Sequence, residues 1–94
     1  MEAALSAHPA VLECGVVGAP DAERGQIVKA YVVPREGAAP DAALVRALQE
    51  HVKAAIAPYK YPRAVEFVEA LPRTQTGKLR RAALRERAEA EAGR

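Results

Sequence analysis

Residues 11–33 read VLECGVVGAPDAERGQIVKAYVV, and this stretch decides the fold. Two segments within it, residues 11–17 (VLECGVV) and 26–33 (QIVKAYVV), are rich in β-branched side chains and are short for helices, so we predict two strands. The eight residues between them, 18–25 (GAPDAERG), contain Pro20 and two glycines. A loop of this kind allows a hairpin-like connection, so we expect an antiparallel pair.

The flanking residues predict helices on both sides of this pair. A short helix over residues 2–7 ends near His8, because the residue before a proline leaves the helical region. Asp41 is placed to cap a second helix that Pro58 ends. The apolar positions of this second helix recur at the spacing of one helical face: Leu44, Leu48, Val52, Ala55 and Ile56.

The C-terminal part predicts one more strand and one more helix. Residues 64–68 (AVEFV) form a third short strand with Val65 and Phe67 on one face. From Leu79 onward the chain has helical composition, and its apolar positions thin out toward the end. The sequence therefore predicts one α+β domain over residues 1–94, in which helices pack on a small three-stranded sheet made of an antiparallel pair plus a third strand.

Composition limits what such a chain can do. Its 94 residues are 50% hydrophobic but only 4% aromatic. A chain of this length buries roughly 60 to 65% of its unfolded surface, which excludes a large enclosed active site. No apolar run is long enough for a membrane span and no leader pattern is present, so we expect a cytoplasmic protein. The single cysteine, Cys14, is expected to be a buried small side chain, and no residue spacing predicts a metal site for His8 or His51.

The two halves of the chain carry opposite net charge. Residues 1–52 hold four basic and seven acidic side chains, whereas residues 53–94 hold ten basic and five acidic ones, which gives −3 and +5. A basic half is typical of a phosphate-bearing partner such as a nucleic acid, a nucleotide or a coenzyme, although a solvated charged surface is the commoner explanation.

The segment LPRTQTGKLRR, residues 71–81, is the one best suited to chemistry. Pro72 restricts the backbone at the start of the segment, and Thr74 and Thr76 can hydrogen-bond the backbone of the loop. Gly77 relieves the conformational constraint on the backbone beside Lys78. Lys78 is then a positioned charge with three donors for carboxylate or phosphate oxygens. The glycine that a phosphate-binding P-loop requires is absent, since Pro72 stands in its place. The alternative is that Lys78 simply begins a basic surface helix.

Three landmarks of the sequence resemble the small C-terminal domain of the adenylate-forming enzymes, which include the acyl-CoA and aryl-CoA synthetases. They are residues 2–33, the proline-flanked APYKYPR at 57–63, and LPRTQTGKLRRAALR at 71–85. The last resembles the family signature P-K-T-x-x-G-K-x-x-R, with Arg73 in place of the usual lysine. The resemblance favours acyl-CoA or aryl-CoA ligases, with a slight preference for benzoate-type acids.

The resemblance implies an ATP-dependent, AMP-forming carboxylate–CoA ligase. Such enzymes convert a carboxylic acid and ATP into an acyl-adenylate and then pass the acyl group to coenzyme A. The small domain rotates between the two steps, and the resemblance assigns Lys78 to acyl-adenylate formation. Mg²⁺ would accompany ATP and be held mainly by the large N-terminal domain, which is the expected partner and is absent from these residues together with the hinge. The chain alone is therefore expected to be inactive.

The resemblance also suggests where coenzyme A binds. The segment that matches residues 59–63 carries part of the CoA surface in the family, so Lys53, Tyr59, Lys60 and Arg63 are candidate contacts. Tyr59 could stack on adenine while the cations meet phosphates. In the alternative interpretation Tyr59 and Tyr61 are aromatic residues at the edge of the core.

Two non-catalytic alternatives stay open. The chain could be a regulatory module of the same fold, although an intact signature around Lys78 argues against that. It could also bind RNA or another polyanion through its basic half. With three tyrosines, one phenylalanine and no aromatic RNA-binding pattern, the sequence gives this last function little support, and we expect no nucleic-acid partner.

Overall fold

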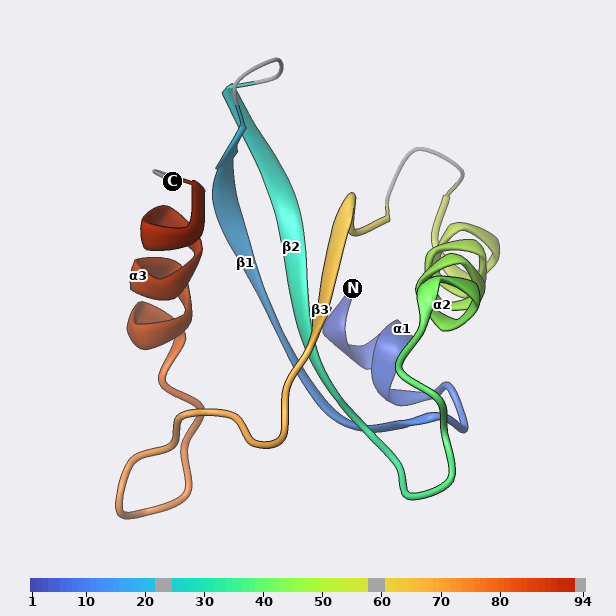
Figure 1. Ribbon diagram of the computed structural model, residues 1–94, viewed down its shortest axis with the longest axis horizontal. Coiled ribbons are helices and arrows are strands. Elements are labelled where there is room, and N and C mark those ends of the chain that lie inside the picture. Colours follow the sequence, from blue (N-terminus) through green and yellow to red (C-terminus); the bar gives the residue numbers. More distant parts are fainter. Residues whose placement is uncertain (22–24, 58–60, 93–94) are drawn as a thin grey trace.

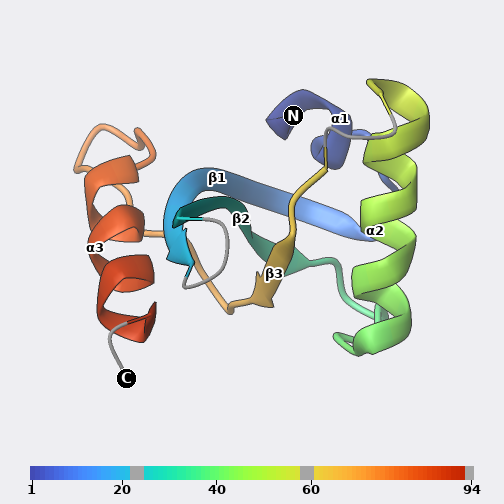
Figure 2. The ribbon, with the colours of Figure 1, turned by 90° about the horizontal axis from the view of Figure 1, so that it is seen from above.

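A three-stranded sheet lies between two layers of helix (Figures 1 and 2). The structure is a computed structural model that describes residues 1–21, 25–57 and 61–92. The elements in chain order are α1 (Glu2–Ser6), β1 (Val11–Asp21), β2 (Gly25–Pro34), α2 (Ala42–Ala55), β3 (Ala64–Phe67) and α3 (Arg81–Ala92). The predicted α+β class and the order of the elements are confirmed.

The sheet is mixed, with β2 in its centre. Strand β2 pairs with β1 in the antiparallel sense and with β3 in the parallel sense. The antiparallel pair was predicted, whereas the direction of the third strand was not. A parallel neighbour requires a crossover connection, and α2 lies in that connection.

The hairpin is longer than the sequence predicted. Residues 18–25 were expected to form a loop, but β1 continues to Asp21 and the register runs on to the pair Asp21↔Gly25. Pro20 is accommodated because β1 is an edge strand, where a missing N–H is tolerated. The eight-residue loop was therefore a wrong prediction, because strand pairing outweighs the local preference of the sequence GAPD for a turn.

Side chains on the two faces of the sheet belong to two separate cores. Alternation along β2 directs Ala30 and Val32 to one face and Tyr31 and Val33 to the other. The first face packs on α1 and α2, and the second face packs on α3 (Figure 2). The buried residues are Leu5, Val11, Ala30, Val32, Leu48 and Val52 on the α2 side, and Val17, Ala19, Tyr31, Val33, Leu71, Leu84 and Ala88 on the α3 side.

Strand β3 contributes to the core on the α2 side. Val65 and Phe67 both pack there, so the prediction that they share a face is confirmed. The strand itself ends at Phe67, one residue earlier than expected.

Helix α2 begins as predicted and ends slightly earlier than its apolar pattern suggested. The carboxylate of Asp41 accepts a hydrogen bond from the backbone N–H of Leu44 at 2.9 Å, which confirms the N-cap. Ala55 and Ile56, the last two positions of the predicted apolar face, are both exposed, Ile56 to 43%, so the buried part of this face ends at Val52.

Helix α3 begins at Arg81 and not at Leu79. The backbone of Leu79 instead forms an isolated antiparallel bridge with Arg73, which holds the residues before the helix in an extended conformation. Leu84 is buried against the sheet, and Leu79 packs at the edge of the same core. In the part of the chain that the structure describes, no helix is of a length and hydrophobicity that could cross a membrane.

Candidate functional site

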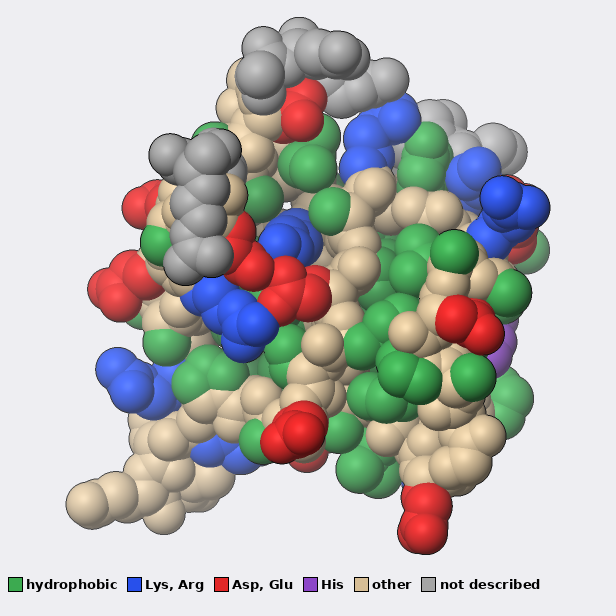
Figure 3. All heavy atoms as spheres, viewed as in Figure 1, with side chains coloured by type: hydrophobic (Ala, Val, Ile, Leu, Met, Phe, Trp, Pro, Cys, Tyr) green, Lys and Arg blue, Asp and Glu red, His purple; other side chains and the backbone are tan. Residues whose placement is uncertain are grey.

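The signature loop, defined here as residues 72–81, connects β3 to α3 and protrudes from the body of the molecule (Figures 1 and 3). Its tip is a tight turn in which the N–H of Gly77 donates to the carbonyl of Thr74 at 2.9 Å, and the N–H of Thr74 donates to the carbonyl of Lys78 at 2.8 Å. Gly77 has a φ of +88°, a backbone conformation that residues with a side chain rarely adopt. The predicted role of Gly77 beside the lysine is therefore consistent with its backbone.

Hydroxyl groups brace this turn from inside. The Thr74 Oγ1 atom accepts a hydrogen bond from the N–H of Lys78 at 3.1 Å, as predicted for a threonine that binds its own loop. Thr76 Oγ1 lies 3.0 Å from Thr74 Oγ1 and so binds the other threonine and not the backbone. At the base of the loop the carbonyl of Pro72 accepts from the N–H of Arg80 at 2.9 Å. These bonds fix the backbone on both sides of Lys78.

Two arginines tie the signature loop to the acidic half of the chain. Near its start Arg73 forms an ion pair with Glu13 of β1, and near its end Arg81 forms one with Glu2 of α1. The second pair is bidentate: Arg81 Nη1 contacts Glu2 Oε2, and Arg81 Nη2 donates to Glu2 Oε1 at 2.8 Å. The N–H of Val16 also donates to Glu2 Oε2 at 2.9 Å. The Arg81 guanidinium is the main reason that the pKa of the Glu2 carboxyl lies below its ordinary value.

Lys78 stands apart from these pairs. Its side chain is exposed, and within residues 1–21, 25–57 and 61–92 no group accepts a hydrogen bond from its ammonium or forms an ion pair with it. Arg73 and Arg81 of the same loop are neutralised by carboxylates, whereas the exposed guanidinium of Arg80, like Lys78, has no described partner. The loop therefore presents two cations without a described partner, and Lys78 is the one that follows the braced turn directly.

A second basic cluster lies where α2 ends and β3 begins. Lys53 Nζ lies 4.3 Å from the ring centroid of Tyr61, and the guanidinium carbon of Arg63 lies 4.9 Å from it. Arg63 Nη1 also donates to the Tyr61 hydroxyl at 2.8 Å. Tyr61 itself packs at the edge of the core on the α2 side, as the alternative interpretation expected. The structure thus brings Lys53 and Arg63 together, whereas Tyr59 and Lys60 lie outside the described residues.

The signature loop and the basic cluster around Tyr61 lie far apart on the molecule. The signature loop lies near the α3 end of the long axis of the molecule, and the end of α2 lies near the opposite end (Figures 1 and 2). The sheet and both cores separate them. A single bound molecule of modest size would contact one of these surfaces but not both.

The two histidines, 43 residues apart in the sequence, lie in contact in the structure. The rings of His8 and His51 meet edge to face with their centroids 5.1 Å apart. The pKa of His8 lies below its ordinary value, mainly because burial desolvates the ring and secondly because His51 is close. Cys14 is only half-buried, less than predicted, and packs at the edge of the core on the α2 side; its burial raises the pKa of the thiol, which is typical of an unreactive cysteine. Among the residues that the structure describes, no group of three or more His, Cys, Asp or Glu could hold a metal ion.

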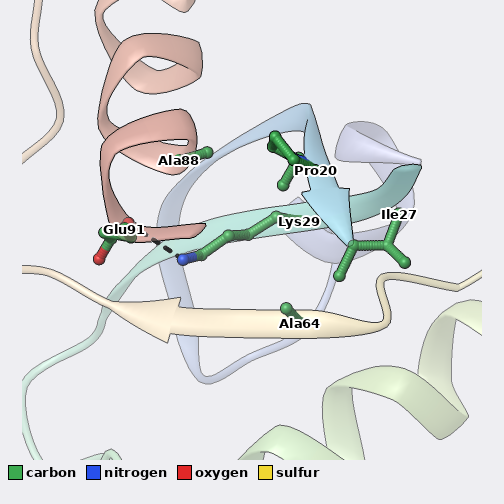
Figure 4. A pocket seen from close by; sticks show the side chains of 7 residues that line it. Pro20, Ile27, Lys29, Ala64, Ala88 and Glu91 are labelled. Carbon is green, nitrogen blue, oxygen red and sulfur yellow. Dashed lines mark hydrogen bonds and ion pairs between the residues drawn. The ribbon is translucent and has the colours of Figure 1, made fainter. Parts of the chain in front are cut away.

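A pocket of about 190 Å³ opens between α3 and the sheet (Figure 4). The side chain of Lys29 points across it to Glu91, with 3.1 Å between Nζ and Oε1. Glu66 also binds Lys29 at 3.2 Å, and the Tyr31 hydroxyl donates to Glu91 at 2.7 Å. The charged groups that line this pocket therefore neutralise each other, which indicates a structural link between α3 and the sheet.

Known proteins share this fold and sequence. Residues 1–78 match the family described as AMP-binding enzyme C-terminal domain. The chain is 55% identical over 89 residues to an uncharacterized acyl-CoA ligase of Bacillus subtilis, which covers 95% of this chain and 17% of that protein. It superposes on an acyl-CoA synthetase of Brucella canis with a TM-score of 0.90 and 44% identity, covering 99% of this chain and 17% of the other.

A second solved structure is an anthranilate CoA ligase in complex with anthranoyl-AMP, with a TM-score of 0.90 and 42% identity, covering 99% of this chain and 18% of that one. The chain thus spans less than a fifth of the length of these proteins. The resemblance inferred from the signature is confirmed, since the family match covers most of the residues and the folds agree. The chain belongs to the family of AMP-binding enzyme C-terminal domains, in the form found in acyl-CoA synthetases.

Proposed function

We propose that this chain is the mobile small domain of an ATP-dependent, AMP-forming carboxylate–CoA ligase and that Lys78 is its catalytic lysine. The observation that carries the proposal is the exposed Lys78 ammonium, which has no described partner, on a loop where the other two cations of the signature, Arg73 and Arg81, are paired. The large N-terminal domain of the ligase would supply the phosphate-binding residues, the Mg²⁺ of ATP and most of the acid pocket.

The role of Lys78 in this proposal is electrostatic. When a carboxylate attacks the α-phosphorus of ATP, negative charge gathers on the phosphate oxygens and two anions are brought together. An ammonium with three donors offsets that charge and holds the carboxylate in place. The bonds of Thr74 and Gly77 keep the backbone of Lys78 fixed, so little reorganisation is needed at the moment of reaction.

The second part of the proposal concerns coenzyme A. Lys53 and Arg63 converge on Tyr61 and form a suitable surface for the phosphates of a nucleotide. Lys53 Nζ also lies 3.2 Å from Oε1 of the exposed Glu50, but an exposed pair of this kind is weak and a phosphate can replace it. Tyr59 and Lys60 complete the proposed CoA surface as predicted contacts. Because this surface and Lys78 lie at different ends of the domain, each would face the large domain in a different orientation, which agrees with a rotation between the two half-reactions.

A chimera tests both parts. This chain would replace the matching C-terminal domain of the anthranilate CoA ligase, to which it is 42% identical. Adenylation would be measured as pyrophosphate release from ATP and anthranilate, and thioester formation as CoA-dependent consumption of the preformed adenylate. We expect Lys78→Ala to slow adenylation about a hundred- to thousandfold, as is typical when one preorganised charge-stabilising group is lost. Lys53→Met and Arg63→Met should instead raise the KM for coenzyme A.

Arg85→Met is the matched control, because Arg85 is exposed on α3 and lies outside both proposed sites. Unchanged adenylation in the Lys78→Ala chimera would contradict the catalytic role. A wild-type chimera no faster than the ligase without its small domain would favour a non-catalytic module. ATP-dependent thioester formation by the 94-residue chain alone would contradict the proposal that a large partner domain is needed.

A further inference from the structure

One ion pair links strand β1 directly to the loop that carries Lys78. Arg73 Nη2 contacts Glu13 Oε1, and the two side chains are 42% and 33% exposed. Arg73 lies five residues before Lys78, whereas Glu13 lies in a different element near the start of the chain. The pair therefore joins the turn to the sheet, which both cores hold in place.

Arg73 makes a second contact that reaches the turn itself. Its Nη1 atom donates to the carbonyl of Gly77 at 2.9 Å, and Gly77 is bonded to Lys78. A guanidinium presents several donors in one plane, so it can bind the Glu13 carboxylate and the Gly77 carbonyl at the same time. The result is a continuous connection from Glu13 through Arg73 to the residue that precedes Lys78.

An irregularity in β1 directs Glu13 toward this loop. The register shifts between Val11 and Glu13, and Leu12 is the extra residue, 53% exposed. Val11 packs in the core on the α2 side, whereas Val17 packs on the α3 side, so the alternation of the strand changes face at the bulge. If residues 11–13 alternated as in a regular strand, Glu13 would share the face of Val11, away from the signature loop; the extra residue instead places Glu13 on the opposite face. A β-bulge can re-aim a side chain in this way.

We propose that Glu13 and Arg73 form a positioning pair that sets the geometry of the turn at Lys78 for acyl-adenylate formation. Neither residue touches a reactant. This inference rests on the proposed catalytic role of Lys78 and adds to it a residue of β1 that lies 65 positions away in the sequence. It predicts that breaking the pair lowers the rate of adenylation while the binding of substrates is unchanged.

The first test needs no activity. Amide hydrogen exchange would be measured by NMR in the 94-residue chain for wild type, Glu13→Gln, Arg73→Gln, Arg73→Lys and the double variant Glu13→Gln/Arg73→Gln. We expect Glu13→Gln to lower protection at Thr74, Gly77 and Lys78 by about two- to fivefold, the range in which exposed ion pairs act. Arg73→Gln also loses the hydrogen bond to the Gly77 carbonyl, so it should lower the protection of the same amides by about tenfold. Protection at Tyr31 should not change in any variant.

The second test uses the chimera with the same variants and reads kcat and KM for ATP and acid. A positioning role lowers kcat and leaves KM unchanged, because the interaction acts in the transition state. The double variant should have a kcat no lower than that of Arg73→Gln, because the second substitution has no ion pair left to break. Arg73→Lys keeps the charge that pairs with Glu13, so it should recover the part of kcat that Glu13→Gln removes. Glu86→Gln, the same chemical change at an exposed site on α3, is the control.

The outcomes separate this inference from the proposed function. If Glu13→Gln behaves as Glu86→Gln in both tests, or if the two single effects add in the double variant, the positioning pair is wrong even when Lys78→Ala abolishes adenylation. If Lys78→Ala has no effect, the proposed function fails, and the positioning of a catalytic lysine fails with it. Reduced protection across the whole sheet would show that Glu13 stabilises the fold in general and would also overturn the inference.

Discussion

Gly15 allows α3 to pack on β1, and adding one methyl group there should destabilise the protein. A Cβ atom at Gly15 would lie 2.7 Å from Leu84 Cδ1 and 3.2 Å from Leu79 Cδ2. Leu84 is 1% exposed and cannot move away freely. Overpacking of this kind costs about 1 to 3 kcal/mol, of which the lower entropy of the unfolded alanine chain offsets about 0.4 to 1 kcal/mol. The centre of these ranges predicts that Gly15→Ala lowers the free energy of unfolding by about 1.3 kcal/mol and at most about 2.6 kcal/mol, with a central shift in Tm of roughly 5 to 10 °C.

Urea unfolding followed by circular dichroism would measure this change, and Gly18→Ala provides a control. A Cβ at Gly18 would also meet an atom at 2.7 Å, but that atom is Nε2 of the exposed Gln26, which can move. Gly18→Ala should thus be neutral or slightly stabilising. Leu84→Ala alone should cost about 2 to 5 kcal/mol, and the double variant Gly15→Ala/Leu84→Ala should cost less than the sum, since the clash is gone. Additive effects within about 0.5 kcal/mol would refute this explanation.

Three further predictions concern a cap and two titrations. Asp41→Ala removes the N-cap of α2 and should cost about 1 kcal/mol, measurable as a lower Tm. Burial is the main reason that the pKa of Tyr31 is raised to about 12, and the hydrogen bond to Glu91 is the second. The neutral Tyr31 therefore makes its full contribution to the free energy of unfolding below pH 10, and this contribution is lost as the pH rises toward 12. Absorbance at 295 nm should show a late tyrosinate phase that Tyr31→Phe removes. The pKa of Glu2 is lowered, mainly by Arg81, so stability from Glu2 is present above about pH 4.5 and is lost as the pH falls through the folded-state value. Glu2→Gln should flatten the dependence of the urea midpoint on pH between 7 and 3.

Local patterns predicted most of the fold because strands, helix caps and helix faces depend mainly on residues that are close together in the sequence. The Asp41 cap and the shared face of Val65 and Phe67 are examples. The extension of β1 to Asp21 was missed because its sequence favours a turn, and only pairing with β2 outweighs that preference. The parallel direction of β3 was not predicted, although the helix between β2 and β3 is the crossover that a parallel pair requires.

The candidate site was predictable only in part for a similar reason. The signature pointed to Lys78, Thr74 and Gly77, whose mutual contacts are local. Glu2 and Glu13 were not identified, because they meet the signature loop across 79 and 60 residues of sequence and no local pattern marks such pairs. Sequence alone could not show that these carboxylates neutralise part of the basic half. The catalytic role of Lys78 remains a prediction.

The central position of β2 has a consequence for how the chain folds. Its pairing with β1 joins residues that are close in sequence, down to Asp21↔Gly25, so the hairpin closes a short loop at little entropic cost. Its pairing with β3 must wait until the residues from Pro34 to Ala64, including α2, have been brought back to the sheet. We expect the hairpin to be formed in the folding transition state and β3 to join late, which would make substitutions in β3 accelerate unfolding more than they slow folding.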